Sequence, residues 1–208
     1  MFKNFFKSKF SLIIIVPFIF LVVNLIFWGY FSLKSIPEDC FDQEECYAKY
    51  LNEGVGYHGQ DQHDKAIASF QKAIKYKPDV FIPYTNIGTS YRKKGDFDKA
   101  EEYFKKAIEK APNEYIIYYK LYELYYYDLK KYPHEMYVFF RDALEKTNND
   151  INMVKSYAFY LEQINDPIPA LELWRAIIKT DSENQAYKDK IKELEKSVKE
   201  QFPEYDLK

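Results

Sequence analysis

Histidine is the side chain best suited to acid–base and metal chemistry near neutral pH, and the chain contains three, His58, His63 and His134. His58 and His63 have Asp61 and Asp64 nearby, so a metal ion or a proton relay has to be considered. Their spacing fits no metal-ligand pattern, and the chain has no glycine-rich phosphate loop, nucleophile elbow or zinc-protease motif. We therefore expect no catalytic residue, metal or cofactor, and interpret the two histidines as part of a solvated turn at a helix end.

Cysteine offers a second kind of chemistry, and the chain has two, Cys40 and Cys46, in the segment CFDQEEC. Structural zinc needs four ligands, which two thiols alone do not supply. A disulfide between them requires the segment to turn, because a regular helix would place residues six apart on different faces. The sequence leaves open whether the two cysteines are bridged or are free thiols.

The elements that carry these side chains follow a long apolar segment. From Phe10 to Leu33 the chain has no charged side chain, and Asn24 is the one strongly polar residue. About 20 such residues cross a bilayer core as a helix, and membrane helices tolerate a proline such as Pro17. The segment exceeds the roughly 7 to 15 apolar residues of a cleavable secretion signal and lacks a small-x-small cleavage site. We expect an uncleaved transmembrane helix at 10–33.

The charges on either side of this segment predict its orientation. Lys3, Lys7 and Lys9 lie in the basic N-terminus, residues 1–9, whereas residues 34–46 are mainly acidic. Because the positive flank usually stays in the cytoplasm, we expect the rest of the chain to lie in the periplasm or at the cell surface. A mitochondrial outer-membrane protein that faces the cytosol is the alternative. Beyond Lys34 the chain carries 26 basic and 32 acidic side chains, a net charge of −6, which argues against nucleic acid as a partner.

Two later segments repeat with a period of 34 residues. The residues Gly54, Tyr57, Ala66, Phe70, Ala73 and Pro78 recur as Gly88, Tyr91, Ala100, Phe104, Ala107 and Pro112. Within each unit the apolar residues have helical spacing, which indicates a helix pair that cannot bury its apolar face alone. Small glycine and alanine residues allow the two helices to approach, and the aromatic residues fill the space between them. Stacked pairs then form the core.

These units resemble the tetratricopeptide repeat, whose pattern W-x2-L-G-x2-Y…A-x3-F…P has the same period. The second unit fits every position, with Tyr84 and Ile87 in place of tryptophan and leucine. The resemblance implies an all-α fold: an N-terminal transmembrane helix, then an α-solenoid of about four helix pairs over residues 47–182. We expect the repeats at about 47–80, 81–114, 115–150 and 151–182, the third with a two-residue insertion in the stretch DLKKYPHE.

The sequence after residue 182 lacks the repeat pattern but has one apolar stripe, formed by Tyr187, Ile191, Leu194 and Val198. Solenoid ends need a helix with a polar outer face. We therefore expect a capping helix at 183–200 and a tail at 201–208.

The resemblance also implies where a partner binds, because the first helices of successive repeats line a concave groove. Transferred by register, the groove positions are Leu51, Val55, Ile82, Thr85, Thr89, Arg92, Ile116, Tyr119, Glu123 and Tyr126. One subgroup of the family grips the C-terminal tail of heat-shock chaperones with lysine, asparagine and arginine at two such positions in three repeats. Here those positions hold Leu51, Val55, Thr85, Thr89, Tyr119 and Glu123, so we expect no chaperone tail to bind.

The pattern as a whole favours a membrane-tethered scaffold that binds another protein or peptide, for example as an aid to envelope protein assembly or quality control. A structural or assembly subunit of a membrane complex, held through Asn24 and Gly29, is the alternative. An enzyme is the least favoured hypothesis.

Overall fold

The structure is a computed structural model that describes residues 40–207. The predicted transmembrane helix at 10–33, the basic segment 1–9 and residues 34–39 of the acidic segment 34–46 lie outside these described residues. Between residues 40 and 207, no helix is both long enough and apolar enough to cross a bilayer.

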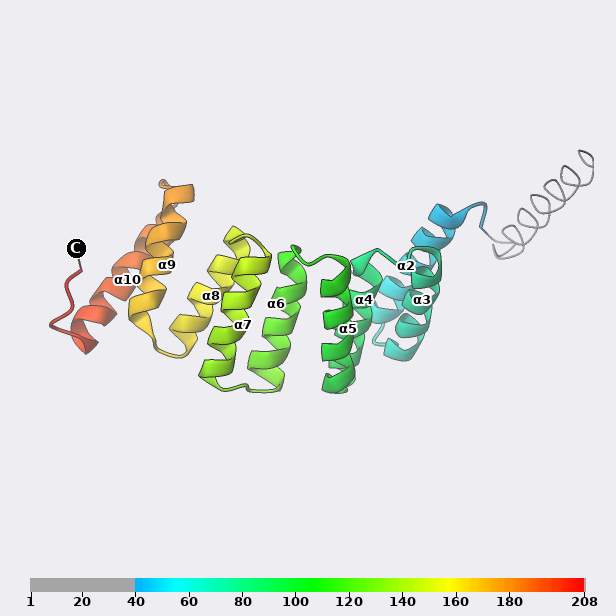
Figure 1. Cartoon of the computed structure of the whole chain (residues 1–208), viewed down its shortest axis with the longest axis horizontal. Coiled ribbons are helices and arrows are strands. Elements are labelled where there is room, and N and C mark those ends of the chain that lie inside the picture. The colour runs from blue at the N-terminus through cyan, green and yellow to red at the C-terminus, as the bar shows by residue number, and fades with distance from the viewer. Residues whose placement is uncertain (1–39, 208) are drawn as a thin grey trace, which may run out of the picture.

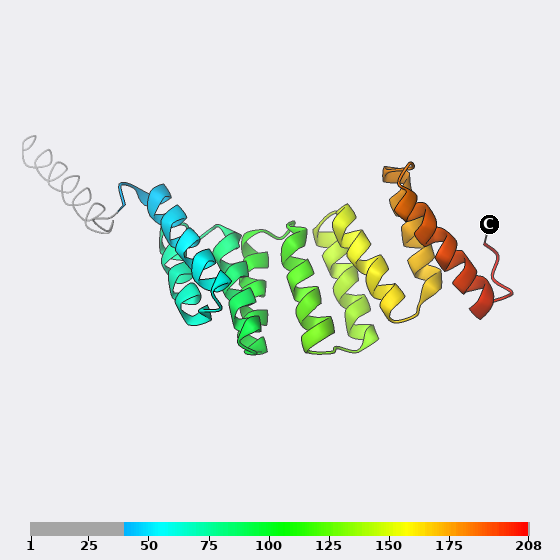
Figure 2. The same ribbon diagram turned by 180° about the vertical axis from the view of Figure 1, so that it is seen from behind.

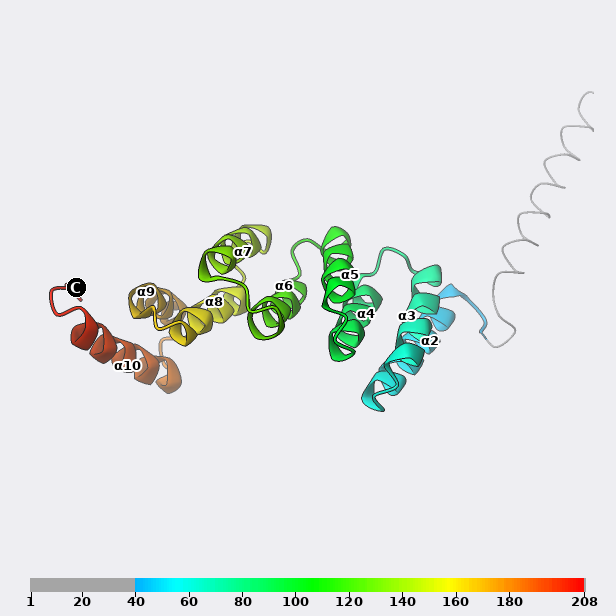
Figure 3. The ribbon, with the colours of Figure 1, turned by 90° about the horizontal axis from the view of Figure 1, so that it is seen from below.

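Residues 40–207 form nine α-helices and no strand, so the predicted all-α solenoid is confirmed for this part of the chain. Successive helices stand side by side in chain order, and the array runs from α2 at one end to α10 at the other (Figures 1 and 2). Seen along the helices, α5 and α7 lie in one layer and α4, α6 and α8 in the other (Figure 3). The helices are α2 (Gln43–Gly59), α3 (His63–Tyr76), α4 (Phe81–Lys93), α5 (Phe97–Lys110), α6 (Tyr115–Glu123), α7 (Pro133–Lys146), α8 (Ile151–Gln163), α9 (Pro167–Ile177) and α10 (Gln185–Gln201).

The first two helix pairs, α2–α3 and α4–α5, pack a glycine of one helix against a phenylalanine of the other. A Cβ atom added at Gly88 would lie 2.7 Å from the Phe104 ring, and one at Gly54 would lie closer still to the Phe70 ring. Both rings are buried. Any larger residue at these positions would have to displace the phenylalanine ring or the helix that carries it, and the close approach predicted from the sequence is present.

A repeated hydrogen bond fixes where each unit meets the next. The Tyr84 hydroxyl donates to the carbonyl of Pro78 over 2.9 Å, and the Tyr118 hydroxyl donates to the carbonyl of Pro112 over the same distance. In both cases the tyrosine lies in the first helix of one unit and the proline at the end of the previous unit. The proline therefore ends a helix and also supplies an acceptor for the next one.

The third pair, α6–α7, departs from this pattern. Its second helix begins at Pro133, 36 residues after the start of α5 at Phe97, which agrees with the predicted two-residue insertion. Immediately after α6, residues Leu124–Asp128 form a π-helical turn, η2, so part of the insertion lies in the helix rather than in the loop. The close backbone contacts between α6 and α7 are few, in contrast to those of the first two pairs.

At the C-terminal end of the solenoid, helix α10 packs on α9. Pro167 is the first residue of α9, a position where its missing N–H costs nothing. After the 3₁₀ turn η3 (Ile178–Thr180), α10 packs against α9 and buries Leu194 and Val198. Helix α10 occupies the position of the predicted cap at 183–200. The chain then folds back, and the Arg175 guanidinium donates to the carbonyl of Leu207 over 2.8 Å.

Candidate binding groove

The first helices of the pairs carry much of the exposed apolar surface. Among the described residues, eight large hydrophobic side chains are exposed, and four of them belong to α2, α4, η2 and α8. These four are Val55, Ile82, Tyr127 and Phe159, whose exposed fractions run from 40% to 56%. Large apolar side chains are costly to leave in water, so a face that keeps several of them exposed is a candidate for contact with a partner.

A hollow of about 480 Å³ lies between α6 with η2 on one side and α8 on the other. Its aromatic and apolar lining consists of Tyr115, Ile116, Tyr119, Tyr122, Tyr127 and Phe159. Its polar lining consists of Asn152, Lys155, Ser156 and Gln163. The volume lies within the range of sites that take a small molecule or a few side chains of a peptide. Two of the predicted groove residues, Ile116 and Tyr119, line it.

A second hollow of about 410 Å³ adjoins the first. Tyr126, Tyr127, Lys130, Lys131 and Gln163 line it, and the first hollow shares Tyr127 and Gln163. The two therefore form one continuous surface along α6, η2 and α8, which we call the tyrosine groove. It includes Tyr126, a third residue predicted for the site.

Ring contacts build the wall of the tyrosine groove. The Tyr122 ring stacks on Tyr126 with 5.7 Å between ring centroids, and Tyr127 meets Tyr126 edge to face at 4.9 Å. Tyr122 is buried, and this burial, together with the neighbouring Tyr127 hydroxyl, raises the pKa of its own hydroxyl. The rings are in contact with one another, and they present a rigid aromatic wall.

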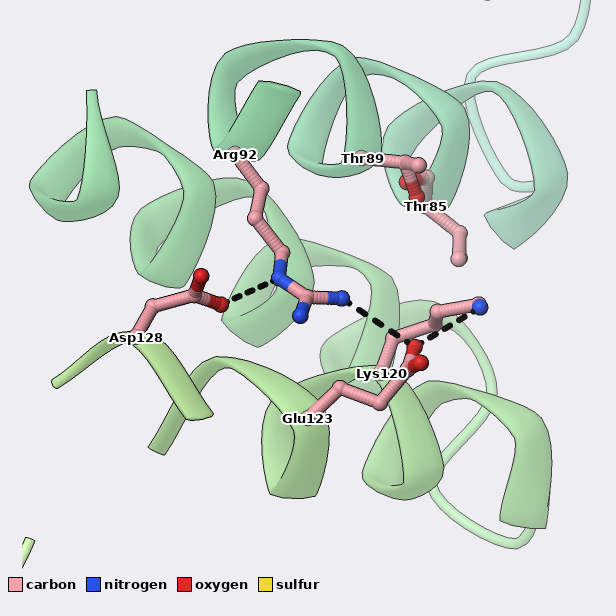
Figure 4. Close-up of polar contacts among 6 residues, drawn as sticks. All are labelled: Thr85, Thr89, Arg92, Lys120, Glu123 and Asp128. Atoms are coloured by element: carbon pink, nitrogen blue, oxygen red, sulfur yellow. Dashed lines mark hydrogen bonds and ion pairs between the residues drawn. The ribbon is translucent and has the colours of Figure 1, made fainter. Parts of the chain in front are cut away.

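A charged cluster closes the space between α4 and α6 (Figure 4). The Arg92 guanidinium pairs with Asp128 through Nε and with Glu123 through Nη1, the latter at 3.2 Å. Glu123 also pairs with Lys120 at 2.8 Å. These side chains neutralise one another, so Arg92 and Glu123, both predicted for the groove, join the second repeat to the third.

The groove residues predicted on α2 and α4 differ in how far they are exposed. Thr85 is buried, and its hydroxyl donates to the carbonyl of Phe81 over 3.2 Å, so the expectation that it faces a partner is corrected. Thr89 lines a small hollow of about 120 Å³ together with Val55. Ile82 is exposed, whereas Leu51 packs against the buried clusters beneath α2. The tyrosine groove thus draws on residues of the third and fourth units.

The interpretation of the two histidines as part of a solvated turn at a helix end is correct in place but wrong about the solvent. His58 lies in the last turn of α2 and His63 begins α3, and both are partly buried. His58 Nδ1 lies within hydrogen-bond distance of Ser90 Oγ, at 3.0 Å, and the Ser90 hydroxyl also lies 2.9 Å from the carbonyl of Asn86. The His58 and His63 rings lie 5.1 Å apart. Burial, followed by the charge of His63, lowers the pKa of His58. Within residues 40–207 no group of three histidine, cysteine, aspartate or glutamate side chains could hold a metal ion.

The two cysteines, which the sequence left as either bridged or free, form a disulfide with their Cα atoms 5.3 Å apart. The required turn comes before the helix: Asp42 is the N-cap of α2, and its side chain accepts from the Glu45 N–H over 2.8 Å. Cys46 lies in the first turns of α2 and is fully buried. The disulfide therefore ties the start of the described chain to the first helix pair.

Sequence reasoning missed several residues of the tyrosine groove, above all Tyr127, Lys130 and Lys131. The register of the regular repeat does not apply after Leu124, because the π turn rotates every later residue of the segment. The two-residue insertion was the available signal. It pointed to a change of register between the two helices but not to the residue where the change begins.

Comparison with known proteins bears on the first two units. Residues 82–114 and residues 50–80 each match a family model described as tetratricopeptide repeat. Among solved structures, the chain is similar to the TPR domain of Arabidopsis OM64, at 16% identity and a TM-score of 0.39, over 74% of this chain and 98% of that one. No curated protein matches the sequence.

Proposed function

We propose, from the tandem tetratricopeptide repeats that this chain contains, that it is a scaffold tethered to a membrane, which holds a peptide segment of another protein in its tyrosine groove. A tetratricopeptide domain fits a role in protein interaction. Stacked helix pairs offer one continuous surface built from many repeats, and such surfaces recognise extended partners. In this role the chain binds its partner and carries out no reaction.

The observation that carries this proposal is the aromatic lining of the tyrosine groove. Tyr119, Tyr127 and Phe159 line it, and Tyr127 and Phe159 are about half exposed. Tyrosine adds a large contact area and loses little conformational entropy when a partner binds, so it is enriched among the residues that dominate binding energy. Covering these side chains with a peptide is lower in free energy than leaving them in contact with water.

The membrane tether is supported by the sequence of residues 10–33, which has the length and apolar character of a transmembrane helix. Such an anchor would hold the groove close to the bilayer surface. The tether therefore limits partners to proteins that reach the same surface, such as envelope proteins during assembly or quality control.

The disulfide between Cys40 and Cys46 supports placing the repeat domain outside the cytoplasm. Disulfides persist in oxidising compartments and are rare where glutathione and thioredoxin keep thiols reduced. This support is independent of the lysines at 3, 7 and 9, which favour the same orientation.

Site-specific photo-crosslinking in cells tests the groove. Probes at Phe159 and Val55 sample two ends of the exposed apolar face, and a control probe at Lys196 on α10 samples a side chain that is 78% exposed. We expect Phe159 to capture a distinct protein that Lys196 does not. Identical products from all three probes, or none, would overturn the binding proposal.

Protease treatment and thiol alkylation of intact cells and of spheroplasts test the location. A repeat domain outside the cytoplasm should be cleaved by protease added to intact cells, if it lies at the cell surface, or to spheroplasts, if it lies in the periplasm. Its cysteines should react with an alkylating reagent only after reduction. A protected domain with freely reactive thiols would place it in a reducing compartment and overturn this part of the proposal.

A further inference from the structure

The tyrosine groove carries local charge of the opposite sign to its domain. Its lining residues include Lys155, Lys130 and Lys131 but no aspartate or glutamate. The chain beyond Lys34 has a net charge of −6, so three lysines without an acidic neighbour in the lining are a local reversal of charge. A local charge of this kind selects partners by complementarity.

The three lysines are less neutralised than the other cations on this face. The Lys155 ammonium lies 5.2 Å from the centroid of the Tyr187 ring and forms no ion pair within the described residues. Lys131 lies over the Tyr125 ring at 4.2 Å, pairs with Glu135 over 3.9 Å, and also interacts with the more distant charge of Glu101. Lys130 has a positive φ of 49° and also makes no ion pair in the described part of the chain.

Neighbouring cations on the same side of the molecule provide the contrast. Arg92 has two carboxylates, those of Glu123 and Asp128, and Lys120 shares Glu123. These charges are already paired and offer little to a partner. The positive charge that remains for a ligand is therefore mainly that of Lys155 and Lys130, next to the aromatic lining, whereas the exposed, long ion pair of Lys131 with Glu135 neutralises that lysine in part.

We propose that the tyrosine groove selects an acidic peptide segment that carries a large apolar side chain. The apolar side chain packs against Tyr119, Tyr127 and Phe159, and carboxylates beside it pair with Lys155 and with Lys130 or Lys131. This inference rests on the proposed function and names the class of partner. Asn152 and Gln163 in the lining can donate to the backbone carbonyls of such a segment.

The aromatic residues and the lysines contribute in different ways. Covering the aromatic side chains provides most of the affinity, because the burial of apolar area is what chiefly drives proteins to associate. Each exposed lysine–carboxylate pair adds little, about 0.2 to 1 kcal/mol, and is weakened by salt. The lysines therefore provide selectivity for acidic segments, and the selectivity should decline as the salt concentration rises.

Selection from a displayed library of random peptides, with the full chain in detergent as the target, tests the inference. We expect the selected peptides to combine tryptophan, phenylalanine or leucine with aspartate or glutamate close by. Replacing Lys130, Lys131 and Lys155 together with glutamine should weaken their binding about ten-fold, the sum of two modest charge pairs. Replacing Lys196 with glutamine serves as the matched control and should leave binding unchanged.

A further variant separates this inference from the proposed function. Phe159→Ser removes an exposed apolar side chain from the groove lining, and circular dichroism checks that the fold is retained. Neutral or basic peptides that lose binding in Phe159→Ser would overturn the acidic selectivity while the scaffold function remains. Failure to select any peptide that depends on Phe159 would overturn both.

Discussion

The first two helix pairs and the third pair place very different residues at the same repeat position. In the first two pairs this position is Gly54 and Gly88, and a phenylalanine ring of the partner helix fits against the bare backbone. In the third pair it is Tyr122, 34 residues after Gly88, and its ring lies 5.3 Å from that of Phe140. A glycine lets two helices approach closely, whereas a tyrosine keeps them apart and fills the space with its own ring.

Tyr122, the residue that differs, also lines the hollow of about 480 Å³ that lies between α6 with η2 and α8. Where α6 and α7 are held apart, Tyr122 also contacts Tyr126 and Tyr160, so aromatic rings extend from the core to the surface beside α8. The regular pairs bury their phenylalanine rings, and they carry hollows of about 420 Å³ along α3, α4 and α5 and of about 120 Å³ between α2, α3 and α4. These hollows have fewer aromatic side chains in their lining than the tyrosine groove has. The departure from the repeat pattern therefore adds to the aromatic lining of the groove through Tyr122 and Tyr127.

Alkaline pH should weaken the third and fourth pairs most. Burial raises the pKa of Tyr118 and of Tyr160 to about 12, and it also raises the pKa of Tyr122, Tyr125 and Tyr137. The folded state then holds these protons more tightly than the unfolded chain does. Their contribution to stability is complete below pH 10 and is lost as the pH rises from 10 towards 12. By pH 12 the ionisation of Tyr118 and that of Tyr160 should each lower the free energy of unfolding by about 2 kcal/mol.

Urea unfolding at a series of alkaline pH values measures this effect. In a Trp28→Phe chain, the fluorescence of Trp174 reports on α9 alone, and circular dichroism reports on all helices. We expect the two unfolding curves to coincide near neutral pH, and the Trp174 curve to move to lower urea first above about pH 10. Curves that still coincide at high pH would show that the two regions respond alike.

Removing the Tyr122 ring should have the next largest effect. Tyr122→Ala leaves a cavity among the rings of Tyr126, Phe140 and Tyr160, because the side chain is almost completely buried. Loss of a buried aromatic ring costs about 3 kcal/mol in the free energy of unfolding. The matched control is Tyr127→Ala, which removes a ring that is 56% exposed and should cost well under half as much. Equal losses in the two variants would contradict the structural role given to Tyr122.

Replacement of glycine with alanine should have opposite effects on stability at the packed Gly88 and at the exposed Gly56. In Gly88→Ala the new Cβ meets the Phe104 ring at 2.7 Å and the carbonyl of Ala100 at 3.2 Å, which should lower the free energy of unfolding by about 2 kcal/mol. In Gly56→Ala the Cβ meets nothing, so the better helix former should raise the stability by about 0.8 kcal/mol. Thermal unfolding of both variants measures the two signs. A stabilising Gly88→Ala would show that the helices can separate at no cost.

The sequence predicted the regular part of this fold well because that part repeats. Matching residues 34 apart identify the helix pairs, and Gly88, Ala100 and Phe104 have a direct physical role in bringing two helices together. The family models match these same two units. Local pattern and tertiary packing agree here, so the pattern alone was sufficient.

The groove was harder to predict because its geometry depends on where the insertion is absorbed. Two extra residues fit equally well into a loop or into a helix, and the π turn at Leu124–Asp128 changes the direction of every side chain after it. The ion pairs of Arg92 likewise depend on that turn, since Asp128 is at its end. Thr85 was assigned by register, but its hydroxyl bonds to its own helix, a choice that threonine often makes.

The smallest expected effect is the loss of the tyrosine–proline hydrogen bond, which is present both in a regular pair, at Tyr84, and in the third pair, at Tyr118. Tyr84 and Tyr118 each donate to a proline carbonyl six residues earlier, but Tyr118 is 2% exposed and Tyr84 is only partly buried. Tyr118→Phe should cost about 1 kcal/mol at neutral pH, and Tyr84→Phe about half of that, because water reaches the carbonyl more easily there. Urea unfolding of both variants measures these losses.

The Tyr118→Phe variant also has a pH dependence whose sign can be stated. The raised pKa of Tyr118 means that the native protein loses stability as its phenol ionises above pH 10, and phenylalanine has no proton to lose. By about pH 11 that loss, roughly 1.4 kcal/mol, exceeds the roughly 1 kcal/mol that the hydrogen bond contributes. The stability curves of the native protein and Tyr118→Phe should therefore cross near that pH. Parallel curves would mean that Tyr118 ionises equally easily in the folded and unfolded states. The burial of Tyr118 would then not make the protein less stable at alkaline pH.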